Sequence, residues 1–133
     1  MNPPPVGTAE REAPPSVEFP GFLPDDALRT LLQSATFYVQ PSLHEAFGCA
    51  VAEAMLSGCI PVVSDRGSLP EVVGESGRYV RPDDPRELAV AIQSVVEQSP
   101  EFVEPPAARI ARLFPLGHRR AQLYRLFEEL CPT

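Results

Sequence analysis

Hydrophobic residues along this chain follow two alternating periods. Short runs rich in β-branched and aromatic residues predict strands at residues 17–19, 36–39, 60–63 and 78–80. After each run, apolar residues recur every three or four positions, which is the spacing of one face of a helix. The chain is therefore predicted to alternate strands and helices from residue 17 onward.

Proline and glycine mark the ends of the predicted helices. Pro24, Pro85 and Pro115 stand at helix starts, whereas Gly58 and Gly74 end two others, the second of them a short helical turn over residues 69–73. The apolar positions expected on the packed side of each longer helix are Leu28, Leu31, Leu32 and Ala35; Phe47, Ala50, Val51, Ala54 and Met55 in a helix over residues 46–57; Leu88, Ile92, Val95 and Val96; Ala107, Ile110, Ala111 and Phe114; and Leu123, Leu126, Phe127 and Leu130.

Helices that alternate with short buried strands are typical of an α/β fold with a parallel sheet and right-handed crossovers. We therefore predict a partial doubly wound, Rossmann-like parallel sheet. Residues 1–16 are rich in proline and hold little that a core could bury, so they are predicted to be a flexible tail. The domain itself is predicted to span residues 17–133 and to end in helices.

Composition excludes several classes of function. The chain has 133 residues, enough for one domain, and a net charge of −7, which argues against partners such as nucleic acid or anionic membranes. No apolar run approaches the roughly 20 residues of a transmembrane segment. The odd count of cysteines, Cys49, Cys59 and Cys131, favours reduced thiols over disulfides or a metal site. We expect a cytoplasmic protein.

The most informative segment is residues 41–54, between the second and third predicted strands. Glu45 precedes the predicted helix, and a helix that begins near Phe47 would leave the backbone N–H groups of Phe47, Gly48 and Cys49 free for a phosphate or a hydroxyl oxygen. Glu53 follows about two turns into the helix, only ~80° round from Glu45 if the helix held throughout. Two carboxylates and a helix N-terminus suit a ligand with both hydroxyl groups and phosphates.

A structural interpretation of the same residues stays open at this point. An acidic residue near a helix N-terminus often caps the helix, and Glu53 on an amphipathic helix is often only solvated. Five arginines near the C-terminus make that region basic: Arg109, Arg112, Arg119, Arg120 and Arg125. They are expected either to form a solvated face or to contact a phosphate or a partner domain.

Several motifs resemble one enzyme family. Residues 44–48, 53–55 and 58–63 resemble the donor-site signature of the retaining glycosyltransferases with the GT-B fold, the large "group 1" family. Residues 64–73 and 77–85 resemble the segments that follow in that family, and residues 21–23 resemble the end of an earlier strand. The motifs occur in the right order over about residues 17–98.

The resemblance implies a role for each matching residue. Glu45 would be the residue of the catalytic centre that holds hydroxyl groups of the donor hexose. The backbone of Phe47, Gly48 and Cys49 would bind the sugar and the diphosphate. Glu53 would hold the ribose. Gly67 and Ser68 would line the donor site. The substrate would be a nucleotide-diphosphate sugar, transferred with retention by front-face displacement, with no cofactor and no catalytic metal.

The resemblance also implies missing parts. The family's C-terminal domain begins with two strands whose loop carries an arginine and a lysine for the diphosphate, and residues 1–16 offer only Arg11. The acceptor-binding N-terminal domain is absent too. We therefore expect a truncated domain that forms a homo-oligomer or pairs with a separately encoded N-terminal half. The alternatives are a non-catalytic nucleotide-sugar-binding or interaction module, and a structural remnant.

Overall fold

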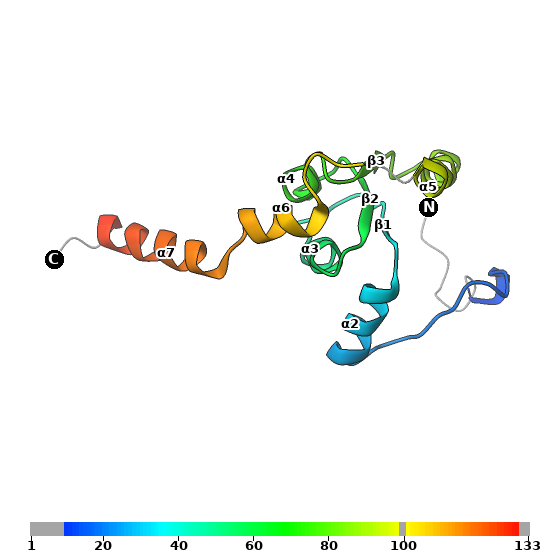
Figure 1. The fold of residues 1–133 in the computed structure, drawn as a ribbon, viewed down its shortest axis with the longest axis horizontal. Coiled ribbons are helices and arrows are strands. Elements are labelled where there is room, and N and C mark those ends of the chain that lie inside the picture. Colours follow the sequence, from blue (N-terminus) through cyan, green and yellow to red (C-terminus); the bar gives the residue numbers. More distant parts are fainter. Residues whose placement is uncertain (1–9, 99–100, 131–133) are drawn as a thin grey trace.

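The computed structural model describes residues 10–98 and 101–130, and Figure 1 shows their arrangement. Three parallel strands, β1 (Phe37–Gln40), β2 (Ile60–Ser64) and β3 (Arg78–Val80), form a sheet in the order β1-β2-β3. The helices are α2 (Asp25–Ser34), α3 (Cys49–Leu56), α4 (Leu69–Val73), α5 (Pro85–Gln98), α6 (Pro106–Leu113) and α7 (Leu116–Leu130).

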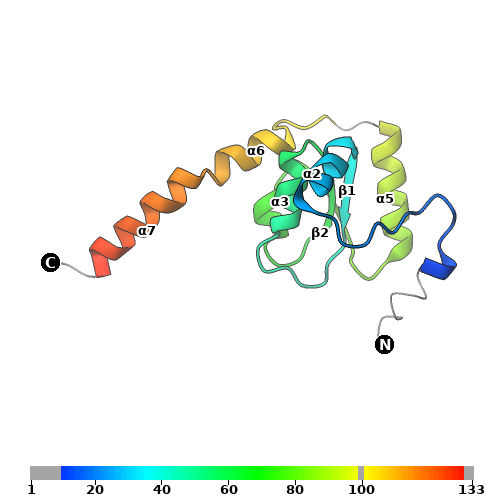
Figure 2. The ribbon, with the colours of Figure 1, turned by 90° about the horizontal axis from the view of Figure 1, so that it is seen from below.

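Helices cover both faces of the sheet, because consecutive residues of a strand point to opposite sides. On one face, Val63 of β2 packs into a core with α3, α4 and Ile110 of α6. On the other, Val62 packs with Val80 of β3 and Val95 of α5. Figures 1 and 2 show α5 on one side of the strands and α3, α4 and α6 on the other. The predicted α/β fold with a parallel sheet is confirmed.

The prediction for the helix over residues 46–57 was wrong at its start. The helix begins at Cys49, because Gly48 adopts a left-handed conformation with φ of +87° that separates the preceding loop from the helix. Phe47 therefore lies outside the helix and is about half exposed, and Ala50 is also exposed. The buried face of α3 consists of Val51, Ala52, Ala54 and Met55.

The predicted strand at residues 17–19 was also wrong. This segment is irregular, and Val17 and Phe19 are each 47% exposed. A strand exists only through hydrogen bonds to a neighbouring strand, and in the described sheet β1 pairs with β2 alone. Residues 17–19 alternate as a strand would, but they have no partner strand among the described residues. They form an irregular connection instead.

Two predicted helices form without being buried. None of the residues of α2 is buried, and Leu28 and Leu31 remain exposed. Helix α7 projects away from the rest of the protein (Figure 1), and its apolar residues Leu123, Phe127 and Leu130 are exposed. No helix among the described residues is both long and apolar enough to span a bilayer. Residues 1–9 of the predicted tail, and Cys131, lie outside the described residues.

Candidate functional site

The loops that follow the three strands meet at the carboxyl edge of the sheet, where parallel α/β folds bind their ligands. They enclose a hollow of about 360 Å³. Each loop contributes two residues to its lining: Leu43 and His44 after β1, Arg66 and Gly67 after β2, and Pro82 and Asp83 after β3. This is where the sequence predicts the ligand site.

The carboxylate of Glu45 is already bonded within its own loop. Oε1 accepts hydrogen bonds from the backbone N–H groups of Gly48 at 2.9 Å and Phe47 at 3.3 Å, and Oε2 accepts one from Nε2 of Gln40 at 2.6 Å. The expectation that the N–H groups of Phe47 and Gly48 are free was therefore wrong. The glycine at position 48 turns the chain back toward Glu45, which brings these donors to its side chain.

These bonds limit what Glu45 can do for a ligand. A carboxylate offers about four lone-pair positions, and three are occupied. One position remains, enough for a single hydroxyl group. Glu45 therefore holds the loop before α3 in shape, which is the structural role that the sequence left open, and it keeps one acceptor position.

Two further residues, which the sequence pattern did not reveal, support Glu45. The Tyr38 hydroxyl donates to Oε1 of Gln40 at 2.9 Å, and Gln40 in turn donates to Glu45. Burial, and then the negative charges of Glu45 and Glu53, raise the pKa of Tyr38 above its ordinary value. Tyr38 and Gln40 are two residues apart on β1, so strand alternation alone places them on one face.

The loop after β2 packs directly against Glu45. Its Ser68 N–H donates to the backbone oxygen of Glu45 at 3.3 Å. Gly67 has φ of +58°, and any Cβ at this position would collide with that same oxygen. Ser68 Oγ is buried and finds no hydrogen-bond partner among the described residues. The structure therefore brings Gly67 and Ser68 into contact with the backbone of Glu45.

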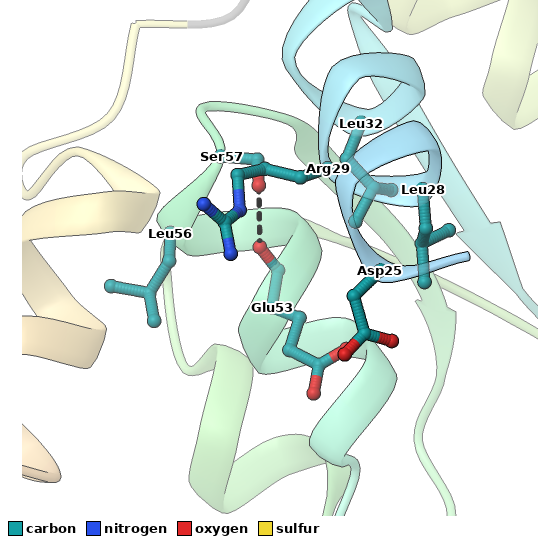
Figure 3. Close-up of a pocket in the computed structure, with 7 residues that line it drawn as sticks. All are labelled: Asp25, Leu28, Arg29, Leu32, Glu53, Leu56 and Ser57. Carbon is teal, nitrogen blue, oxygen red and sulfur yellow. Dashed lines mark hydrogen bonds between the residues drawn. The ribbon is translucent and has the colours of Figure 1, made fainter.

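Glu53 lies in a different hollow, of about 360 Å³, between α2 and α3. Figure 3 shows its carboxylate and that of Asp25 at the same open end, with Arg29 extending from α2 toward α3. The carbonyl of Glu53 accepts a hydrogen bond from Ser57 Oγ at 2.9 Å. Because α3 begins only at Cys49, the helical angle predicted between Glu45 and Glu53 does not apply.

Phe47 and Cys49 line a third hollow, of about 630 Å³, with residues of α4, α6 and α7. The ring of Phe47 meets that of Phe114 edge to face, with centroids 5.5 Å apart. Four of the seven predicted site residues thus line three separate hollows: Glu53, Phe47 with Cys49, and Gly67. Among the described residues, no three His, Cys, Asp or Glu side chains gather as a metal site would require.

The family model for glycosyl transferases group 1 matches residues 3–98, more than half of the chain. The chain belongs to this family. All seven predicted site residues of this group 1 chain lie within the matched segment, whereas α6 and α7 lie beyond it.

Several curated relatives resemble this group 1 chain. It is 38% identical over 84 residues to O-antigen chain mannosyltransferase B of Escherichia coli, a match that covers 62% of this chain and 22% of the relative. It is 39% identical over 102 residues to MMP alpha-(1->4)-mannosyltransferase of Mycolicibacterium hassiacum, covering 74% and 23%. It is 35% identical over 112 residues to D-inositol 3-phosphate glycosyltransferase of a Nocardioides species, covering 81% and 24%. These matches span about a quarter of each relative's length.

A solved structure supports the same fold. Sucrose-phosphate synthase from Thermosynechococcus elongatus superposes with a TM-score of 0.63 and 29% identity, over 75% of this group 1 chain and 26% of the synthase. The described sheet and its helices thus correspond to part of a GT-B fold.

Two of the basic C-terminal residues have structural partners. Arg112 donates through Nε and Nη2 to the carboxylate of Glu104 at 2.7 and 2.8 Å. These bonds are the main reason why the pKa of Glu104 lies below its usual value. Arg109 bonds to backbone carbonyls of α4. Both arginines of this group 1 chain therefore bond within the protein.

Proposed function

We propose that this chain is the donor-binding part of a retaining glycosyltransferase, which transfers a sugar from a nucleotide-diphosphate sugar to an acceptor. The observation that carries the proposal is the junction of Glu45 with the Gly67–Ser68 loop at the carboxyl edge of the sheet. Membership of the group 1 family and the GT-B likeness agree with it.

Each residue of the site takes one part of the donor. Glu45 accepts one hydroxyl group of the sugar at its remaining lone pair, and the Gly67–Ser68 loop, which contacts the backbone of Glu45, lines the site beside it. Since Glu45 already holds the N–H groups of Phe47 and Gly48, the diphosphate meets the N–H of Cys49 and the positive end of α3. Glu53 takes the ribose. Because Gly67 has no Cβ, its loop can lie directly against the backbone of Glu45.

The first donor to test is GDP-mannose. Six of the similar curated proteins are named mannosyltransferases, and one of these, from Xanthomonas oryzae, is a GDP-mannose-dependent alpha-mannosyltransferase that shares 40% identity over 72 residues. The carboxylates of Glu45 and Glu53 each suit vicinal hydroxyl groups, which mannose and ribose both carry. The free thiols of Cys49 and Cys59 fit a reducing compartment, so we place the protein in the cytoplasm.

Calorimetry tests the donor role of Glu53. We expect GDP-mannose, UDP-glucose or ADP-glucose to bind the wild-type chain, and Glu53→Ala to weaken that binding about tenfold, because it removes a charged acceptor from the ribose. Glu97→Ala is the matched control, since Glu97 is an exposed helical glutamate on α5, across the sheet from α3.

The outcomes separate the candidate functions. Equal binding by wild type and Glu53→Ala would remove Glu53 from the ribose site. Donor binding without sugar transfer, even when an N-terminal half is added, would favour the non-catalytic module. If no donor binds at millimolar concentration, the chain is a structural remnant.

We further propose that β1 is completed by another strand, from a second copy or a separate N-terminal half. β1 pairs only with β2 among the described strands, and Val39 at its outer edge is exposed. An open strand edge readily pairs with another chain.

Light scattering tests this pairing on the isolated protein. We expect a mass at least twice the 14.5 kDa of one chain, and we expect Val39→Lys to lower it, because a charged lysine disfavours pairing at a strand edge. Val90→Lys, at an exposed position on α5, should leave the mass unchanged. A stable monomer at all concentrations would contradict self-association, and a mass insensitive to Val39→Lys would exclude the β1 edge.

A further inference from the structure

Arg109 is a mostly buried arginine that binds a helix end rather than a ligand. Its side chain is only 17% exposed. Nε donates to the carbonyl of Val72 at 2.9 Å and Nη2 to the carbonyl of Glu71 at 2.8 Å. Both carbonyls belong to the last turn of α4, where the helix offers no N–H partner of its own. One guanidinium thus caps the C-terminal end of α4 with two charge-assisted bonds.

The fit around the guanidinium is close. Gly74 follows α4 with φ of +53°, and a Cβ at this position would overlap the guanidinium group of Arg109. Glu104 Oε2 lies 3.7 Å from Nη1 and holds Arg109 from its other side. The neighbouring Ile110 is buried in the core that α4 shares with α3. The packing of α6 and the contact with Glu104 therefore hold Arg109 in place, while its guanidinium group binds the end of α4.

Helix α4 needs this support because it is short. It has five residues, and so brief a helix is stable only through packing and capping. Its opposite end is Ser68, which bonds to the backbone oxygen of Glu45. Its side chains also support the loop before α3, since Leu69 and Val72 lie 3.4 and 3.7 Å from the position that a Cβ on Gly48 would occupy. Whatever holds α4 in place also holds Glu45 and Gly48.

We infer that Arg109 is a positioning residue of the donor site: by capping α4 it holds the Gly67–Ser68 loop against Glu45. This inference rests on the proposed donor-binding function. Arg109 lies beyond residues 3–98, which the group 1 family model matches, so the region of α6 contributes to a site formed by the matched segment. Arg109 does not touch the donor and acts only through α4.

Donor affinity and amide hydrogen exchange test the inference together. We expect Arg109→Ala to weaken donor binding about tenfold or more and to speed exchange at amides 68–73, while amides of β2 and α5 exchange as in wild type. Arg112→Ala is the matched control, because it breaks the pair with Glu104 without touching α4. Arg109→Lys, which keeps the charge but lacks the planar fork, should fall between wild type and Arg109→Ala.

Chemical rescue separates positioning from general loss of stability. The deleted side chain leaves a space that a free guanidinium ion fits, so guanidinium chloride at non-denaturing concentration should restore donor binding to Arg109→Ala, whereas sodium chloride should not. Wild-type affinity in a folded Arg109→Ala protein would overturn the inference. The inference would also be overturned if Arg109→Ala and Arg112→Ala weakened donor binding equally and both sped amide exchange throughout the protein.

Failure of the proposed function would give a different pattern. If wild type binds no donor, the donor role itself is lost, and exchange at amides 68–73 still decides whether Arg109 holds the loop. If Arg109→Ala does not fold, Arg109→Lys carries the test: unchanged donor affinity and unchanged exchange at amides 68–73 in that variant would overturn the inference.

Discussion

Replacing Gly67 with alanine is expected to abolish donor binding and to destabilise the protein by about 2 kcal/mol or more. The backbone at Gly67 has φ of +58°, which L-residues adopt only at a cost, and the new Cβ would collide with the backbone oxygen of Glu45. The loop after β2 must therefore move away from the loop after β1. That movement breaks the bond from Ser68 N–H to Glu45 and opens the proposed site.

A glycine elsewhere in the chain provides the control for this substitution. Gly58, after α3, has φ of +97°, yet no atom lies within 4 Å of where its Cβ would be. Gly58→Ala carries the backbone strain without the collision, so it should lower thermal stability but leave donor affinity unchanged. Thermal unfolding followed by circular dichroism, with calorimetry of donor binding, checks both variants. Equal donor affinity in wild type and Gly67→Ala would show that the two loops need not touch.

Periodicity predicted the helices because each helix carries its own signal. The bounds of α2, α5 and α7 follow from apolar spacing and from Pro24, Pro85 and Pro115, all of which are local features. The same signal did not reveal burial. The apolar residues of α7 are spaced for packing, but the described part of the chain provides no surface that covers them.

Features that depend on a distant partner could not be predicted in this way. Residues 17–19 have the composition of a strand, but a strand needs a neighbour to pair with, and the sequence does not show whether one exists. Phe47 was predicted on the packed side of a helix, yet Gly48 starts the helix later and directs Phe47 toward Phe114 instead. Arg109 had no local signal for its role, because its bonds join residues 37 and 38 positions apart in sequence.

The sequence could point to candidate site residues but not to the hydrogen bonds that they make. Gly67 and Ser68 lie against Glu45, although Gly67 is 22 positions from Glu45 in the sequence. The spacing argument for free N–H groups failed, because a glutamate two or three residues before them can accept their hydrogen bonds first. The support from Tyr38 and Gln40 became visible only when β1 placed both beside that carboxylate.

Replacing Glu45 with alanine is expected to have the other large effect. It removes the acceptor of three hydrogen bonds, two of them from the backbone just before α3. These donors lose a charged acceptor, so we expect about 1–2 kcal/mol of destabilisation, measured by denaturant unfolding. Donor binding should fall about tenfold or more, because the sugar loses its acceptor and the loop loses its shape.

Glu45→Gln separates these two contributions. The new amide keeps one oxygen for the N–H groups of Phe47 and Gly48. If the Gln40 amide rotates by half a turn, its oxygen accepts from the new NH₂ group. The Gln40 NH₂ group then donates to the Tyr38 hydroxyl. We therefore expect stability within about 1 kcal/mol of wild type. If Glu45 acts through its charge, donor binding and sugar transfer should fall nearly as far as in Glu45→Ala.

The Tyr38 phenol reports whether the charge was removed without disturbing the loop. Burial and the charges of Glu45 and Glu53 hold its pKa above the ordinary value, so Glu45→Gln should lower that pKa while burial keeps it raised. Absorbance titration of wild type, Glu45→Gln and a Tyr38→Phe reference measures the change. A folded Glu45→Gln protein with lowered Tyr38 pKa and wild-type donor affinity would show that Glu45 only holds the loop before α3 in shape, since the site would then bind its sugar without that charge.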